Sequence, residues 1–143
     1  MRLTPISKTE TLLDAIKTLL DALKINETDN RFSQIAKFPG TSASALLEFL
    51  PALSLPCAAI IYSGSNIANR PLRTLRVSVA VLCEAYEADD IVTLRDHIDA
   101  VMHALDDQIS GDALIVVESD AALDLPDNPA TAAALINIRI EDH

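Results

Sequence analysis

Cysteine, histidine and carboxylate side chains are the groups in this chain that could do chemistry, and their spacing limits what that chemistry could be. The two cysteines, Cys57 and Cys83, have no CxxC partner and no histidine near them in sequence. The chain also lacks a Gly-x-Ser-x-Gly nucleophile elbow. We therefore expect two reduced, buried thiols that behave as small apolar residues. The alternative is a cross-strand disulfide, if the strands that carry them pair as an antiparallel hairpin.

The histidines and carboxylates predict neither a metal site nor a catalytic centre. His97 and His103 are six residues apart on an expected helix, which places them well apart around its axis. Asp99 and His103 have the spacing of a helical ion pair, and a single such pair is rarely a metal site. The run 124–128 offers oxygen ligands but lacks the Asp-x-Asp-x-Asp-Gly spacing of a calcium loop, so we interpret it as a solvated turn. We expect a protein without enzymatic activity, cofactor or metal.

Charge is unevenly distributed along the chain, whose net charge is −10. Residues 57–83 carry three arginines, Arg70, Arg73 and Arg76, and no acidic side chain, whereas residues 84–143 carry fifteen acidic side chains and two arginines. The arginines are either solvated groups of a loop and a strand, or a contact surface for an acidic patch. Because the chain carries such a patch itself, copies could associate head to tail. Arg70, Arg73 and Arg76 are therefore candidate subunit-interface residues.

The hydrophobic pattern predicts an α+β fold in a single domain, residues 1–143. We expect a four-stranded, mainly antiparallel sheet with helices packed on one face, in the order α(α)ββαββ. Alternate residues 75–83 are apolar, and Ala80 and Leu82 on the opposite face indicate that this end of the strand is covered. The expected elements are a helix from Ser7 to Leu23 with a capping box at Ser7 and Glu10, a short helix near 44–50, strands 57–62 and 75–83, a helix from Asp89 to Leu105, and strands 113–117 and 134–141. Residues 64–71 and 121–131 are expected to be loops.

Composition narrows the function classes further. Half of the 143 residues are hydrophobic, but only three Phe and two Tyr are present and Trp is absent. Few side chains are thus available for stacking on bases or for anchoring at a membrane surface. The acidic balance repels a phosphate backbone, so we expect no specific nucleic-acid binding. Without an apolar leader or membrane-length run, we expect a soluble intracellular protein.

The order of elements resembles that of the small tail-completion, or tail-terminator, proteins of tailed phages and prophages, especially those of Mu-like phages. The resemblance rests on the N-terminal helix, the Phe38-Pro39-Gly40 turn, Leu50-Pro51-Ala52, the strand from Pro56 to Gly64, an arginine-containing loop, the long strand 75–83, and a helix followed by two strands. It covers roughly residues 7–141, and the family supplies no catalytic residues.

The resemblance implies a structural role in phage or prophage tail assembly. Tail terminators form a ring, typically a hexamer, which ends the tail tube and joins it to the head. The implied partners are copies of this chain, tail-tube proteins and head–tail connector proteins. The implied location is the host cytoplasm during assembly and then the virion tail. The alternatives are a protein-interaction module of the immunity or adaptor type, and a small enzyme or ligand-binding domain whose site forms only in the fold.

Overall fold

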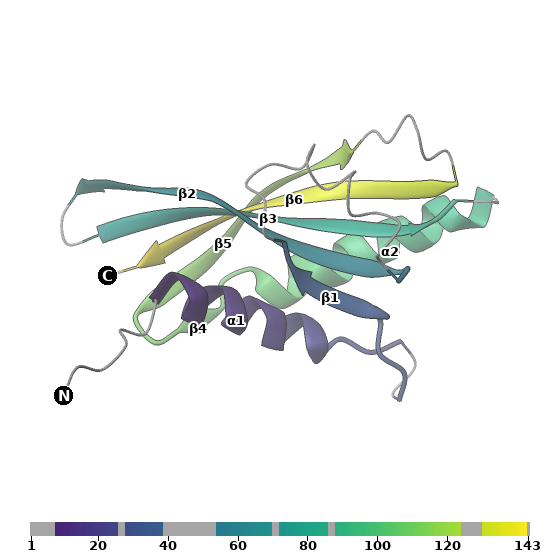
Figure 1. Cartoon of the computed structure of the whole chain (residues 1–143), viewed down its shortest axis with the longest axis horizontal. Helices are drawn as coiled ribbons and strands as arrows, with labels where there is room; N and C mark the ends of the chain where they lie inside the picture. The colour runs from purple at the N-terminus through teal and green to yellow at the C-terminus, as the bar shows by residue number, and fades with distance from the viewer. Residues whose placement is uncertain are drawn as a thin grey trace.

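The computed structural model of the protein describes residues 8–25, 28–38, 54–69, 72–85, 88–123 and 130–142. The described chain forms helices and strands arranged in two layers (Figure 1). They are α1 (Lys8–Asp21), β1 (Gln34–Lys37), β2 (Cys57–Asn69), β3 (Leu72–Glu84), α2 (Ala88–Leu105), β4 (Ile109–Ser110), β5 (Ala113–Leu123) and β6 (Thr131–Asp142). Both long helices predicted from the sequence are confirmed, with ends within two residues where they are described.

The strands form one six-stranded, curled sheet in the order β1-β2-β3-β6-β5-β4. β1 runs parallel to β2, and every other neighbouring pair is antiparallel. The predicted four-stranded, mainly antiparallel sheet with the order α(α)ββαββ is therefore wrong. β1 has four residues and β4 has two, which is too short for a period-two pattern to be recognised. Each becomes a strand because its neighbour supplies backbone partners.

Both helices lie on one face of the sheet and share a core with it (Figure 1). Every second residue of β3 and β6 points to this face and packs against the apolar stripes of α1 and α2. Its deeply buried members include Leu12, Ile16 and Leu20 of α1, Val101 and Leu105 of α2, and Leu75, Val79, Ile136 and Ile140 of the sheet. This helix-side core contains the aliphatic side chains that the composition predicted.

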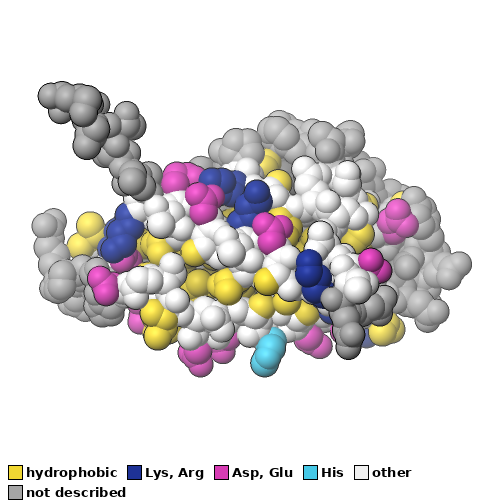
Figure 2. All heavy atoms as spheres, turned by 90° about the horizontal axis from the view of Figure 1, so that it is seen from below, with side chains coloured by type: hydrophobic (Ala, Val, Ile, Leu, Met, Phe, Trp, Pro, Cys, Tyr) yellow, Lys and Arg dark blue, Asp and Glu magenta, His cyan; other side chains and the backbone are white. Residues whose placement is uncertain are grey.

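Ion pairs surround the core on the helix side. Lys37 Nζ lies 2.7 Å from Asp14 Oδ1 and 2.9 Å from Glu10 Oε2, which links β1 to α1. The hydrogen bond with Asp14, and then that with Glu10, raises the pKa of Lys37. Figure 2 views this face and shows hydrophobic side chains in its middle with charged groups around them. Because the groups of this trio are exposed, they stabilise the fold only slightly.

The opposite face of the sheet, which we call the open face, is apolar at one end and polar at the other. Its apolar end contains Cys57, Ala59, Ile61, Ala80 and Leu82, all fully or almost fully buried. The prediction that Ala80 and Leu82 are covered is confirmed. No described helix packs against this face.

The cysteines form no disulfide bond and are buried, as predicted. Cys57 pairs in register with Leu82, not with Cys83. That offset of one residue puts Cys57 on the open face and Cys83 in the helix-side core, so the cross-strand disulfide does not form. Burial raises the pKa of Cys57 to about 11, which keeps this thiol protonated and unreactive.

Two predicted loops are partly strand. β2 continues to Asn69 and β3 begins at Leu72, so the expected loop 64–71 is the end of a hairpin. Likewise β5 extends to Leu123 and β6 begins at Thr131, inside the expected loop 121–131. Ser, Gly and Asn have low strand propensity, but pairing with a long neighbouring strand overrides that preference. Bulges at Tyr62/Gly64 and Val117/Ser119 interrupt the alternation that would have revealed these strands.

Several predictions concern segments outside the described residues. They are the capping role of Ser7, the turn at Pro39-Gly40, the short helix near 44–50, Arg70, and the turn 124–128.

Candidate functional site

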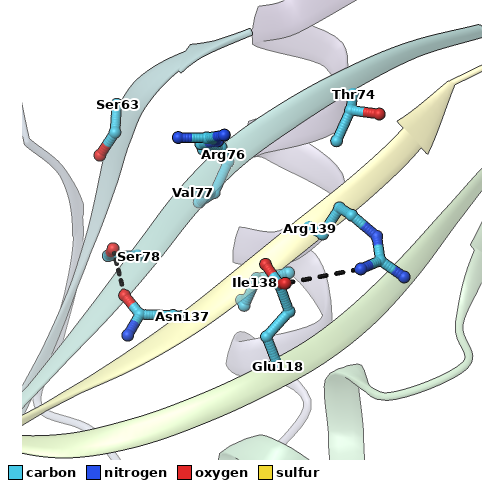
Figure 3. A pocket seen from close by; sticks show the side chains of 9 residues that line it. All are labelled: Ser63, Thr74, Arg76, Val77, Ser78, Glu118, Asn137, Ile138 and Arg139. Atoms are coloured by element: carbon cyan, nitrogen blue, oxygen red, sulfur yellow. Dashed lines mark hydrogen bonds and ion pairs between the residues drawn. The ribbon is translucent and has the colours of Figure 1, made fainter. Parts of the chain in front are cut away.

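The polar end of the open face is a trough of about 410 Å³ on β3, β6 and β5 (Figure 3). Residues of β3 and β6 that alternate with the helix-side core point into it, because successive side chains of a strand face opposite sides. The main lining groups are Ser63, Arg76, Ser78, Glu118, Asn137 and Arg139. The trough thus presents hydroxyl, amide, guanidinium and carboxylate groups beside the apolar residues Val77 and Ile138, and its polar groups suit contacts with another surface.

A row of hydrogen bonds crosses three strands at the floor of this trough. Ser78 Oγ donates to Asn137 Oδ1 at 3.0 Å, and Asn137 Nδ2 donates to Ser119 Oγ at 3.2 Å. Asn137 therefore uses both ends of its amide to hold β3 and β5 at fixed positions beside β6. This row makes the floor rigid and leaves further acceptor positions on the hydroxyl groups.

Two arginines face each other across β3 and β6 in the trough. Arg76 pairs in register with Arg139. Arg139 is neutralised by Glu118, with Nη1 3.5 Å from Oε2 (Figure 3). Glu141 contributes a second ion pair, with Arg139 Nε 3.1 Å from Oε1. Arg76 is exposed, and within the described part of the chain no hydrogen bond or ion pair is assigned to it. Because it is exposed and has no assigned partner within the described residues, Arg76 is a cation suited to an anionic partner.

Arg73 lies on the other face of the sheet. Its Nη2 donates to Thr9 Oγ1 at 2.9 Å and to Tyr62 Oη at 3.3 Å, so it ties β3 to the start of α1. The structure therefore does not bring Arg73 and Arg76 together as one patch. The spacing of Arg73 and Arg76 in the sequence already indicates that they lie on different faces, because residues an odd number apart in a strand face opposite sides.

A second polar cluster, which the sequence did not reveal, joins the segment before β1 to α2. Arg31 Nη1 donates to Asp96 Oδ2 at 2.8 Å and contacts His97 Nδ1 at 3.2 Å, where the ring nitrogen accepts because arginine only donates. The Phe32 and His97 rings lie 5.3 Å apart. An open cavity of about 520 Å³ borders Arg31, Asp96 and His97. The two segments are 65 residues apart, so no local pattern could have indicated the contact.

Burial and charge set the protonation state of this cluster. Burial, and then the nearby Arg31 guanidinium, lowers the pKa of His97, so the ring is neutral in the fold. The hydrogen bond from Arg31 lowers the pKa of the Asp96 carboxyl. A neutral histidine fixed by an arginine, with a largely exposed aspartate beside it, is a structural contact between segments.

A structural comparison relates the fold to a virion component. No family model matches the chain, and no curated protein matches it in sequence. Solved structures do match, and one is a chain from the structure titled "Virion of native gene transfer agent (GTA) particle". That match has a TM-score of 0.56 and 12% sequence identity, and it covers 91% of this chain and 92% of the other. The two chains share a fold.

Of the remaining predicted candidates, His103 borders an open cavity of about 540 Å³ at the end of α2. Asp99 and His103 are both exposed on α2. Among the described residues, no three His, Cys, Asp or Glu side chains are grouped so that they could hold a metal ion. None of the described helices combines the length and apolar character needed to cross a membrane.

Proposed function

We propose that this chain is a structural protein of a phage or phage-like virion. The observation that carries the proposal is the fold, which matches a chain of a gene transfer agent virion over nearly the full length of both chains. The polar trough on the open face, against which no described helix packs, supports an assembly role, because it offers hydrogen-bonding groups and the cation of Arg76 to a neighbouring protein.

The finer proposal is a tail-terminator role. In it, copies of this chain form a ring, of hexamer size, which ends the tail tube and joins it to the head. Tail-tube and head–tail connector proteins are the partners, and assembly takes place in the host cytoplasm. The uneven charge supports head-to-tail contacts, since arginines without acidic neighbours occupy residues 57–83 and most acidic side chains follow them.

Two experiments test the two levels of this proposal separately. Virion particles are purified from the organism that carries the gene, and their proteins are identified by mass spectrometry. The chain is expected among the proteins of the particle, and its absence from intact particles would overturn the virion role.

For the ring, the mass of the purified protein is measured by light scattering at low and at moderate salt. A discrete oligomer that weakens as salt rises is expected, because screening reduces contacts between unlike charges. A 15.4 kDa monomer at every salt and protein concentration would refute self-assembly into a ring.

A further inference from the structure

The turn between α2 and β5 is exposed, acidic and carries an apolar side chain at its surface. We call residues 106–112 the acidic turn; it contains Asp106, Asp107 and Asp112 and no basic residue. Nearly all of its residues are exposed, and Ile109 is 74% exposed. Carboxylates beside the C-terminus of α2 also face the negative end of the helix dipole, which disfavours them. Asp107 and Ile109 therefore contribute little to the stability of the isolated chain and are free to contact another molecule.

Hydrogen bonds hold the acidic turn in one conformation. Asp107 N donates to Ile115 O at 2.9 Å, and Ile115 N donates to Gln108 O at 2.8 Å. Val117 N donates to Asp106 Oδ1 at 3.0 Å. A turn that is already ordered loses little conformational freedom when it binds, so more of its contact energy appears as affinity.

The trough on the open face is complementary to this turn in charge. Arg76 is exposed there, and within the described residues no hydrogen bond is assigned to the hydroxyls of Ser63 and Thr74, which line the trough with it. Figure 3 shows Ser63 and Thr74 on either side of Arg76, whereas Glu118 is directed to Arg139. A guanidinium with free hydroxyls beside it suits a carboxylate, because each of these groups can donate a hydrogen bond to it.

A copy cannot fill its own trough with its own acidic turn, because the sheet lies between them. The trough is on the open face, whereas Figure 1 shows β4 below the sheet, on the side of the helices. We propose that the acidic turn of one copy docks in the trough of the next copy, with its carboxylates against Arg76. Ile109 then packs on the aliphatic stems of Arg76 and Arg139, whose charged groups lie at the far ends of those stems. The inference deepens the ring proposal and rests on it.

This contact joins two different surfaces, so it continues from copy to copy. Each copy in a pair keeps one free surface, either its turn or its trough, and the association closes into a ring where the rotation between copies permits. Contact between two acidic turns is disfavoured, because it would bring like charges together. The turn and the trough are therefore a matched pair only between different surfaces.

Two variants disable the two surfaces separately. Ile109→Ser removes the apolar group of the turn, and Arg76→Glu gives the trough a charge that repels the turn. Each variant alone is expected to need at least about fivefold more protein than the wild type to assemble.

Matched controls make the same changes elsewhere on the surface. Val92 is 63% exposed and Arg95 is exposed, both on α2, so Val92→Ser and Arg95→Glu are expected to assemble like the wild type. Equal effects of control and test variants would overturn the inference, because hydrophobicity or net charge in general would then control assembly. Thermal unfolding confirms that all four variants are folded.

A mixture of the two disabled variants gives the most specific measurement. It is made at a concentration at which neither variant assembles alone. The intact turn of Arg76→Glu then meets the intact trough of Ile109→Ser, and no further intact pair is left. Light scattering is expected to show a complex of twice the mass of the chain and nothing larger. Absence of this complex, or a larger assembly, would overturn the inference.

The outcomes also separate this contact from the ring itself. A wild-type oligomer that both variants form equally well would overturn the inference, while the ring would stand on another contact. A wild-type monomer at every concentration would refute the contact and the ring together. The virion role is tested independently by the proteins of the purified particles.

Discussion

Replacing Arg31 is expected to destabilise the fold far more than replacing Asp96, although the two side chains are ion-paired. Only 13% of the Arg31 side chain is exposed, whereas 69% of the Asp96 side chain is. An ion pair with one largely exposed partner contributes about 0.2–1 kcal/mol. The larger contribution of Arg31 is its hydrogen bond to Nδ1 of His97, a ring that is 2% exposed.

The size of the expected loss of stability depends on which groups each substitution leaves without a partner. In Arg31→Ala, the His97 nitrogen is buried without its donor, which costs about 1–3 kcal/mol, and the ion pair is lost as well. The same substitution also removes Arg31 Nε, a buried group for which no hydrogen-bond partner is found in the described structure, and this offsets part of the loss of stability. We expect a net loss of about 2 kcal/mol for Arg31→Ala, equivalent to about 6–8 °C in Tm. Asp96→Ala should cost about 1 kcal/mol or less.

Urea unfolding followed by circular dichroism at pH about 8 measures both variants. A dilute sample keeps association from contributing to the measured free energy of unfolding. Equal destabilisation by Arg31→Ala and Asp96→Ala, within about 0.5 kcal/mol, would refute the reasoning, because it would mean that the contact with His97 contributes nothing.

Three further outcomes are expected. Because the pKa of His97 is lowered below 6.5 in the fold, the unfolded chain binds more protons than the folded chain near that pH. The free energy of unfolding should therefore fall as the pH drops from about 7 toward the folded pKa, and it should fall less in His97→Gln. Urea titrations at several pH values would show this. Arg73→Ala should lower the free energy of unfolding by about 1–2 kcal/mol, because it removes the hydrogen bonds to Thr9 and Tyr62. Arg76→Ala, at an exposed position, should change it by less than about 0.5 kcal/mol. Similar thermal shifts for both variants would contradict their placement on opposite faces. Ile136→Ala, fully buried in the centre of the sheet, should cost about 2–5 kcal/mol in urea unfolding, and a smaller loss would mean that the core collapses around the cavity.

The two helices and the inner strands follow from sequence because their signals are local. Apolar residues of α1 recur every three to four positions over several turns, and apolar and other residues alternate along most of β3. The period within each segment therefore indicates both its type and its buried face. The aliphatic composition predicts the core, and the charge counts predict that the C-terminal half is acidic. None of these features depends on which element lies beside which.

Strand lengths and the edges of the sheet depend on neighbours. The segment 63–69 has no strand-like composition, and it is strand because β3 pairs with it. β1 is a strand only because β2 lies beside it, and the parallel direction of that pair requires the chain to cross over between them. The predicted four-stranded sheet was therefore wrong: it lacked the two outermost strands and the parallel pairing of β1 with β2.

Positions of individual side chains are decided by register, which sequence periodicity does not supply. One residue of offset between β2 and β3 separates Cys57 from Cys83, and strand alternation separates Arg73 from Arg76. The contact of Arg31 with His97 and the hydrogen-bond row through Asn137 join segments distant in sequence. The sequence by itself determined which residues are apolar, charged and periodic. Only the tertiary structure decided which of them meet, because pairing energies depend on strands that are brought together by folding.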